Sequence, residues 1–101
     1  MFLVLVVQAV PDHLRGYLER FLQEVRTGVY VGTTSRRVAD RLWEVTSQHA
    51  GPGDATMIQS SDSEAGYTIT SRPHPRYSLL DYDGWTLAAT LDTQADPQKP
   101  R

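Results

Sequence analysis

The segment Val10–Trp43 constrains the fold more than any other part of the chain, because two helical patterns flank one short strand pattern in it. Pro11 can begin a helix, where its missing N–H costs nothing, and apolar residues at spacings of three and four follow it. They predict a helix to about Arg26, ended by Thr27 and Gly28, and then a short strand, Val29–Val31. The apolar face of the helix is expected to comprise Leu14, Tyr17, Leu18, Phe21, Leu22 and Val25.

A second helix is expected to follow that strand. Thr34 or Ser35 can cap it, it should run to about His49, and the Gly-Pro-Gly sequence at 51–53 should stop it. Its core side is expected to carry Val38, Leu42 and Val45, with Ala39 and Trp43 beside them.

The remaining apolar runs predict strands. Phe2–Val7 is continuous, as in a strand covered on both faces, and Asp83-Gly84 is a turn signal between two later runs. Further strands are expected at 55–61, 67–71 and 85–91. This order predicts an α+β ferredoxin-like sandwich, with one mainly antiparallel sheet, two helices on one face and a C-terminal strand extension. We expect one domain over residues 1–91 and a flexible polar tail over 92–101.

Composition narrows the function classes. The chain has 101 residues and no cysteine, which removes disulfides, thiolate nucleophiles and zinc–thiolate sites, and fits a cytoplasmic protein. The apolar run at 1–7 is too short to span a membrane, so no membrane partner is expected. The open face of the sheet and its edge strands favour a homodimer, with Tyr67, Ile69, Trp85 and Leu87 expected to line that surface.

The cations are distributed unevenly. The net charge is −2, yet nine of the ten basic residues are arginine, and acidic residues are concentrated in the C-terminal half. Arg36 and Arg37 fall in the first turn of the expected second helix, where the helix dipole disfavours cations by roughly 0.3–1 kcal/mol each. Two interpretations stay open, a phosphate site at this terminus or an Arg36–Asp40 ion pair with a solvated Arg37.

The first helix and a later loop carry further candidates. Arg20 is expected to pair with Glu24, whereas Arg15 either extends beside the core or meets an anion. Gly16 in mid-helix costs about 1 kcal/mol relative to alanine, and it either admits a closely approaching backbone or phosphate or is a tolerated imperfection of the helix. The loop 72–77 carries Arg72, His74 and Arg76. Two interpretations stay open, a contact to the sugar–phosphate backbone of a nucleic acid or an ordinary exposed loop.

Signatures of catalysis are sparse. The three histidines, His13, His49 and His74, lack the spacing of metal ligands, so no histidine metal site is expected. The first strand ends at Gln8, and a neutral amide is a poor ligand for a hard cation.

The motifs VP-x-x-LRG-x-L, EVR-x-GVYVG and LWE, followed by E-x-G and D-x-DG-x-x-L, resemble one known family. The chain is similar over about residues 2–91 to the type I-E subfamily of CRISPR-associated protein two, the small subunit of the spacer-acquisition complex. The resemblance implies a ferredoxin-like homodimer that bridges dimers of the integrase subunit, CRISPR-associated protein one, and clamps a double-stranded protospacer DNA. It also implies that the C-terminal strand segment helps to hold the integrase subunits.

The resemblance assigns roles to particular residues. It implies that the residues that clamp the DNA backbone are His13, Arg15, Arg37 and Arg76. Arg36 is a further candidate because it lies in the first turn of the expected second helix. His13 and Tyr77 stand where the family pattern has arginine, and Gln8 stands where nuclease branches of the family carry a metal-binding acidic residue. We therefore expect a non-catalytic scaffold without a cofactor. The alternative is a Mg²⁺-dependent endonuclease that cleaves RNA or DNA.

Overall fold

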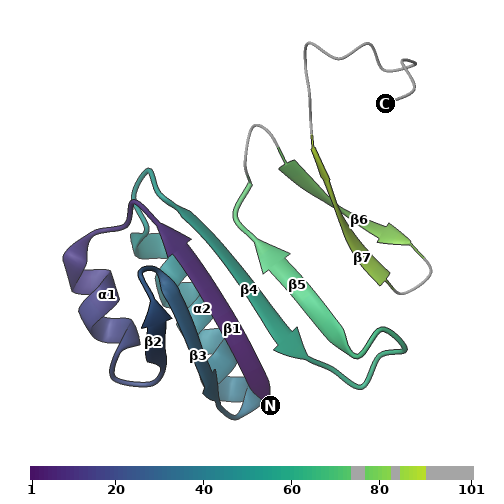
Figure 1. The fold of residues 1–101 in the computed structure, drawn as a ribbon, viewed down its shortest axis with the longest axis horizontal. Coiled ribbons are helices and arrows are strands. Elements are labelled where there is room, and N and C mark those ends of the chain that lie inside the picture. The colour runs from purple at the N-terminus through teal and green to yellow at the C-terminus, as the bar shows by residue number, and fades with distance from the viewer. Residues whose placement is uncertain (74–76, 83–84, 91–101) are drawn as a thin grey trace.

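The fold is a five-stranded antiparallel sheet that carries two helices, followed by a separate two-stranded sheet (Figure 1). The computed structural model describes residues 1–73, 77–82 and 85–90, the last two ranges by their backbone pairing alone. The elements are β1 (Phe2–Gln8), α1 (Asp12–Leu18), β2 (Gln23–Arg26), β3 (Val29–Thr33), α2 (Arg36–His49), β4 (Asp54–Ser60), β5 (Tyr67–Ser71), β6 (Tyr77–Tyr82) and β7 (Trp85–Thr90). The strand order is β2-β3-β1-β4-β5. The predicted α+β ferredoxin-like arrangement is confirmed.

The central strand β1 divides the molecule into a covered and an open side. Leu3, Leu5 and Val7 are at most 2% exposed and pack in one core with side chains of both helices. The alternate residues point to the other face, where Val4 and Val6 are half-buried and Phe2 is 52% exposed. Figure 1 shows α2 lying behind the central strands. The helices thus cover one face of the sheet and leave the other open.

The prediction of one long first helix is wrong. Helix α1 ends at Leu18, and after a short turn the chain forms β2, which pairs with β3. Arg26 pairs with Val29 across a two-residue turn, so Thr27 and Gly28 connect two strands and do not end a helix. Phe21 and Val25, expected on the apolar face, are 42% and 49% exposed.

Helix α2 matches its predicted bounds. Ser35 caps it, since the Ser35 hydroxyl accepts a hydrogen bond of 3.2 Å from the Val38 N–H. Its innermost residues are Ala39, Leu42 and Thr46. The buried stripe is therefore turned by about one position from the predicted one. Neither helix in the described ranges is long and apolar enough to cross a lipid bilayer.

The C-terminal strand extension is present as the β6–β7 hairpin, in which Tyr77 pairs with Thr90 and Tyr82 with Trp85. The turn at 83–84, the residues 74–76 and the predicted tail at 92–101 lie outside the described residues. The domain boundary near residue 91 accordingly stays a prediction.

Candidate nucleic-acid interface

The start of α2 presents two exposed arginines. Arg36 and Arg37 occupy its first turn, which contains no acidic residue. Within the described part of the chain Arg36 forms no ion pair with Asp40, so the pairing interpretation does not account for it. Backbone N–H groups, the positive end of the helix dipole and two guanidinium groups therefore share this end of the helix.

A polar cleft of about 460 Å³ borders Arg36. It lies between the start of α2 and the connection from β4 to β5. The cleft contains hydroxyl groups and also the carboxyl of Asp62, which opposes an anion there. Its lining comprises Met1, Arg36, Gln59, Ser60, Ser61, Asp62, Ser63 and Thr68. Arg37 does not line the cleft and so does not share it with the Asp62 carboxylate. Of the two arginines, Arg37 is therefore the better candidate for binding an anion.

Arg15 is held by an internal ion pair. Its guanidinium donates to Glu24 Oε2 at 2.8 Å, and the same oxygen accepts a hydrogen bond of 2.8 Å from the Gly28 N–H. The predicted Arg20–Glu24 pair is wrong, because Glu24 belongs to β2 and faces Arg15. Arg20 lies 5.8 Å from the centroid of the Phe21 ring. Arg15 is 27% exposed, and an arginine has five N–H donors, so it can still meet a phosphate.

The Arg15–Glu24 pair acts on a buried tyrosine beside it. Tyr30 in β3 is fully buried, and burial is the main cause that raises the pKa of its phenol. The negative charge of Glu24 raises this pKa further, whereas Arg15 opposes the shift. The pair therefore adjoins the hydrophobic core, and its glutamate accepts from the Gly28 N–H in the turn of the β2–β3 hairpin.

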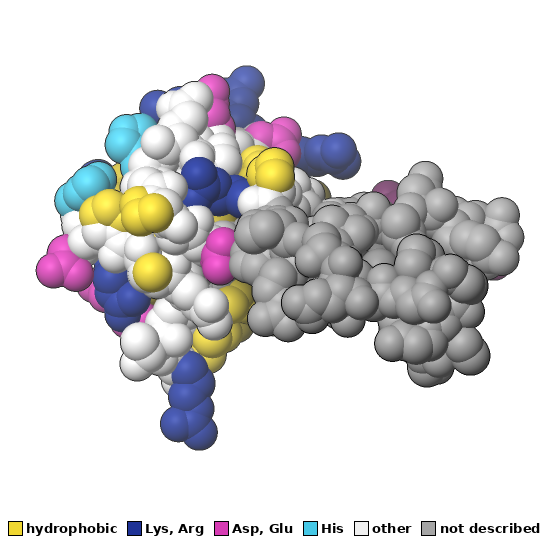
Figure 2. Space-filling model, turned by 90° about the horizontal axis from the view of Figure 1, so that it is seen from above, with side chains coloured by type: hydrophobic (Ala, Val, Ile, Leu, Met, Phe, Trp, Pro, Cys, Tyr) yellow, Lys and Arg dark blue, Asp and Glu magenta, His cyan; other side chains and the backbone are white. Residues whose placement is uncertain are grey.

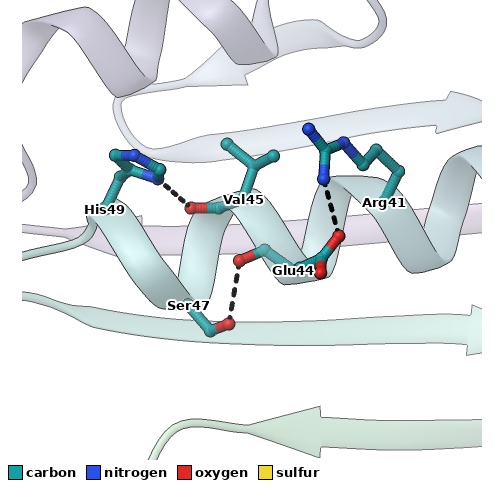
Figure 3. A network of polar contacts seen from close by, with 5 residues as sticks. All are labelled: Arg41, Glu44, Val45, Ser47 and His49. Atoms are coloured by element: carbon teal, nitrogen blue, oxygen red, sulfur yellow. Dashed lines mark hydrogen bonds and ion pairs between the residues drawn. The ribbon is translucent and has the colours of Figure 1, made fainter.

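Two histidines far apart in the sequence meet in the fold. The rings of His13, in the first turn of α1, and His49, the last residue of α2, have centroids 6.1 Å apart and lie nearly perpendicular. His49 Nδ1 is 3.0 Å from the carbonyl oxygen of Val45 (Figure 3). Both side chains are exposed. Sequence spacing gave no signal for this contact, because it depends on how the two helices pack.

Gln8 is the last residue of β1, as predicted, and the structure shows that it is exposed. It pairs with Asp54 of β4 in the strand register. In the described residues no group of three or more histidine, cysteine or acidic side chains is placed to hold a metal ion. A single carboxylate beside an amide is a poor donor set for Mg²⁺.

The loop after β5 divides into a structural part and an undescribed part. Arg72 donates to the carbonyl oxygens of Gly51 and Gly53, and so fastens the turn between α2 and β4. The sequence did not predict this role, because it left the loop open between a contact to a sugar–phosphate backbone of nucleic acid and an ordinary exposed loop. His74 and Arg76 lie outside the described residues, and so does the Tyr77 side chain.

The candidate residues that the structure describes lie at two separate places of the chain and not in one patch. The Thr34 N–H donates to the Met1 carbonyl at 2.9 Å, so α2 begins at the N-terminal end of β1. Helix α1, with His13, begins just beyond the other end of β1. Seven strand residues separate these ends by roughly 20 Å. Figure 2 likewise shows arginine side chains at several separate places, while histidine side chains lie close together.

Residues 2–87 match the family model described as "CRISPR-associated protein (Cas_Cas2CT1978)". This match covers most of the chain, including every element from β1 to β5 and the separated arginines of α1 and α2. The chain therefore belongs to this family of Cas2-like CRISPR-associated proteins.

Proposed function

We propose that this chain is the scaffold and duplex-DNA-binding subunit of a CRISPR adaptation complex of type I-E. Family membership supports a role in adaptation. The observation that carries the DNA-binding role is Arg37, an exposed cation in the first turn of α2 without an ion-pair partner among the described residues. The helix dipole disfavours a cation there, and no contact within the described fold offsets that cost.

The spacing of the candidates suits a duplex. Double-stranded DNA carries one phosphate charge per 1.7 Å of its axis, so the roughly 20 Å along β1 corresponds to about twelve phosphates. In a homodimer the same residues occur twice, related by the twofold axis. Backbone contacts of this kind give affinity without sequence preference, as expected for a subunit that holds protospacers of any sequence.

The proposed partners are a second copy of this chain, the integrase subunit and the protospacer DNA. The homodimer would join through the open face of the sheet, and the β6–β7 hairpin would help to hold the integrase subunits. Scaffolding of this kind requires no cofactor.

The test compares Arg37→Ala with Arg41→Ala. Both arginines are exposed on α2, but Arg41 pairs with Glu44 at 2.7 Å and is the matched control. Fluorescence anisotropy with a labelled duplex, over a range of salt concentrations, measures the binding constant and its salt dependence. We expect Arg37→Ala to weaken binding and to lower the salt slope by about 0.9 per contact, or about 1.8 for the two copies in a dimer.

Stability provides the second measurement. Removing a cation from the first turn of α2 should leave the free protein unchanged or up to about 1 kcal/mol more stable. Weaker binding by a variant of equal or greater stability therefore reports a lost phosphate contact and not a damaged fold. If Arg37→Ala binds with the affinity and salt slope of Arg41→Ala, the clamp assignment fails.

The alternative function is a Mg²⁺-dependent endonuclease. One observation is a reason to test it. Asp54 lies opposite Gln8 and so brings a carboxylate to the strand end where nuclease branches of the family carry an acidic residue. Labelled RNA and duplex DNA are incubated with the protein in Mg²⁺ or in EDTA. We expect no metal-dependent cleavage. Cleavage that persists in Gln8→Ala and disappears in Asp54→Asn would replace the scaffold proposal.

A further inference from the structure

The contact between His13 and His49 joins the two helices at one end of the sheet. The ring centroids are 6.1 Å apart, and both side chains are exposed. Figure 2, seen from the same end of the molecule, shows histidine side chains side by side on an open surface. An exposed pair of imidazoles at this separation is accessible to a ligand from solution.

The hydrogen bond between His49 Nδ1 and the Val45 carbonyl oxygen places His49 in an arrangement that is common among metal ligands. When Nδ1 donates its proton to the Val45 carbonyl oxygen, 3.0 Å away, the other ring nitrogen carries the free lone pair. A backbone carbonyl on the second ring nitrogen is a usual partner of metal-binding histidines, since it fixes the tautomer and the ring orientation. Figure 3 shows this ring beside the Val45 carbonyl at the C-terminal end of α2.

The separation of the rings is close to what a shared metal requires. With metal–nitrogen bonds of about 2.1 Å, two imidazoles on one tetrahedral ion have centroids roughly 5 Å apart. The observed 6.1 Å exceeds this by about 1 Å, which small rotations of two exposed side chains remove. Because no third histidine, cysteine or acidic side chain joins them in the described residues, water would complete the coordination.

We propose that His13 and His49 form a two-histidine site for a borderline transition-metal ion such as Zn²⁺ or Ni²⁺. Imidazole nitrogen suits these ions, whereas Mg²⁺ and Ca²⁺ prefer oxygen. The bound ion cross-links the start of α1 to the end of α2 and stabilises their packing. This inference rests on the ring geometry and does not depend on the proposed DNA-binding function.

The test uses the full chain without a histidine tag. Isothermal titration with NiCl₂ and ZnCl₂ measures affinity and stoichiometry, and thermal unfolding measures stabilisation, with MgCl₂ as the comparison ion. We expect one ion per chain with micromolar affinity, a higher melting temperature with Ni²⁺ or Zn²⁺, and no effect of Mg²⁺ at the same concentration. His13→Ala and His49→Ala should each weaken binding at least tenfold.

His74→Ala removes the third histidine of the chain and serves as the control, which should bind the metal as the unaltered protein does. Because both members of the pair are exposed, their substitution should leave the metal-free melting temperature within a few degrees. Unchanged binding in His13→Ala or His49→Ala, or one ion shared between two chains, would overturn the proposal. In the first case the ring contact is only an edge-to-face packing of aromatic groups.

Discussion

Two glycines of this chain differ in whether the fold requires them. At Gly28 the backbone φ is +81°, and a Cβ there would overlap the carbonyl oxygen of Val7. The two residues are held close because the Val7 N–H donates to the Gly28 carbonyl oxygen at 2.8 Å. At Gly16, in mid-helix, a Cβ would meet no atom within 4 Å. The first glycine is required by the fold, whereas nothing in the described fold requires the second.

Alanine substitutions at these glycines should therefore have opposite effects. Gly16→Ala should raise the free energy of unfolding by about 0.5–1 kcal/mol, because it removes the entropic cost of a mid-helix glycine. Gly28→Ala should lower it by more than about 1 kcal/mol, since it combines backbone strain with a clash. Urea denaturation of the two variants measures both changes. Destabilisation by Gly16→Ala would show that the helix needs the open space at this position in the free protein.

At the scale of elements, the β2–β3 hairpin shows why the sequence was misread. Glycine after an amphipathic stretch is typical of a helix end, and a two-residue turn ending in glycine is equally typical of a hairpin. The spacing of Phe21 and Val25 favoured the helix, but both are exposed, and the chain instead adds an edge strand to β3. Local pattern could not decide, because the pairing energy comes from a strand that follows the turn.

The candidate nucleic-acid interface could also be predicted only in part. Arg36 and Arg37 could be placed at the start of α2 because a helix cap is a local signal, which the Ser35 hydroxyl confirms. The Arg15–Glu24 ion pair could not be predicted, because Glu24 faces Arg15 only when residues 23–26 form strand β2 of the β2–β3 hairpin. The contact between His13 and His49 depends on the packing of two helices, which no spacing along the chain encodes.

The buried tyrosine of β3 predicts an alkaline loss of stability. Burial and the charge of Glu24 raise the pKa of Tyr30 in the folded chain above its ordinary value of 10, so the folded state holds the phenol proton more tightly than the unfolded state. This stabilisation is complete below pH 10 and decreases as the pH rises through the folded pKa. Urea denaturation between pH 8 and 11 should show a decline that is smaller in Tyr30→Phe. An equal decline in both proteins would assign it to other groups.

At the scale of the whole molecule, the open face of the sheet is apolar although the helices leave it uncovered. Val4, Val31 and Ile58 lie on this face in adjacent strands, since Val4 pairs with Val31 on one side and with Ile58 on the other. Ile69 of β5 continues the row beside Ile58. Contiguous apolar surface of this kind marks an interface, and a stable one buries about 1,600 Å² in total.

A charge in the middle of this row should therefore separate the proposed homodimer. Ile58 is half-buried and faces away from the core residue Met57, so Ile58→Lys should leave the fold of each chain intact. Burying its ammonium group against a second apolar face is unfavourable, and the variant should be monomeric where the unaltered protein is dimeric. Gln48→Lys adds the same charge at an exposed position of α2 and should remain dimeric. Light scattering after size exclusion gives the mass of each protein, and a dimeric Ile58→Lys protein would exclude this face as the interface.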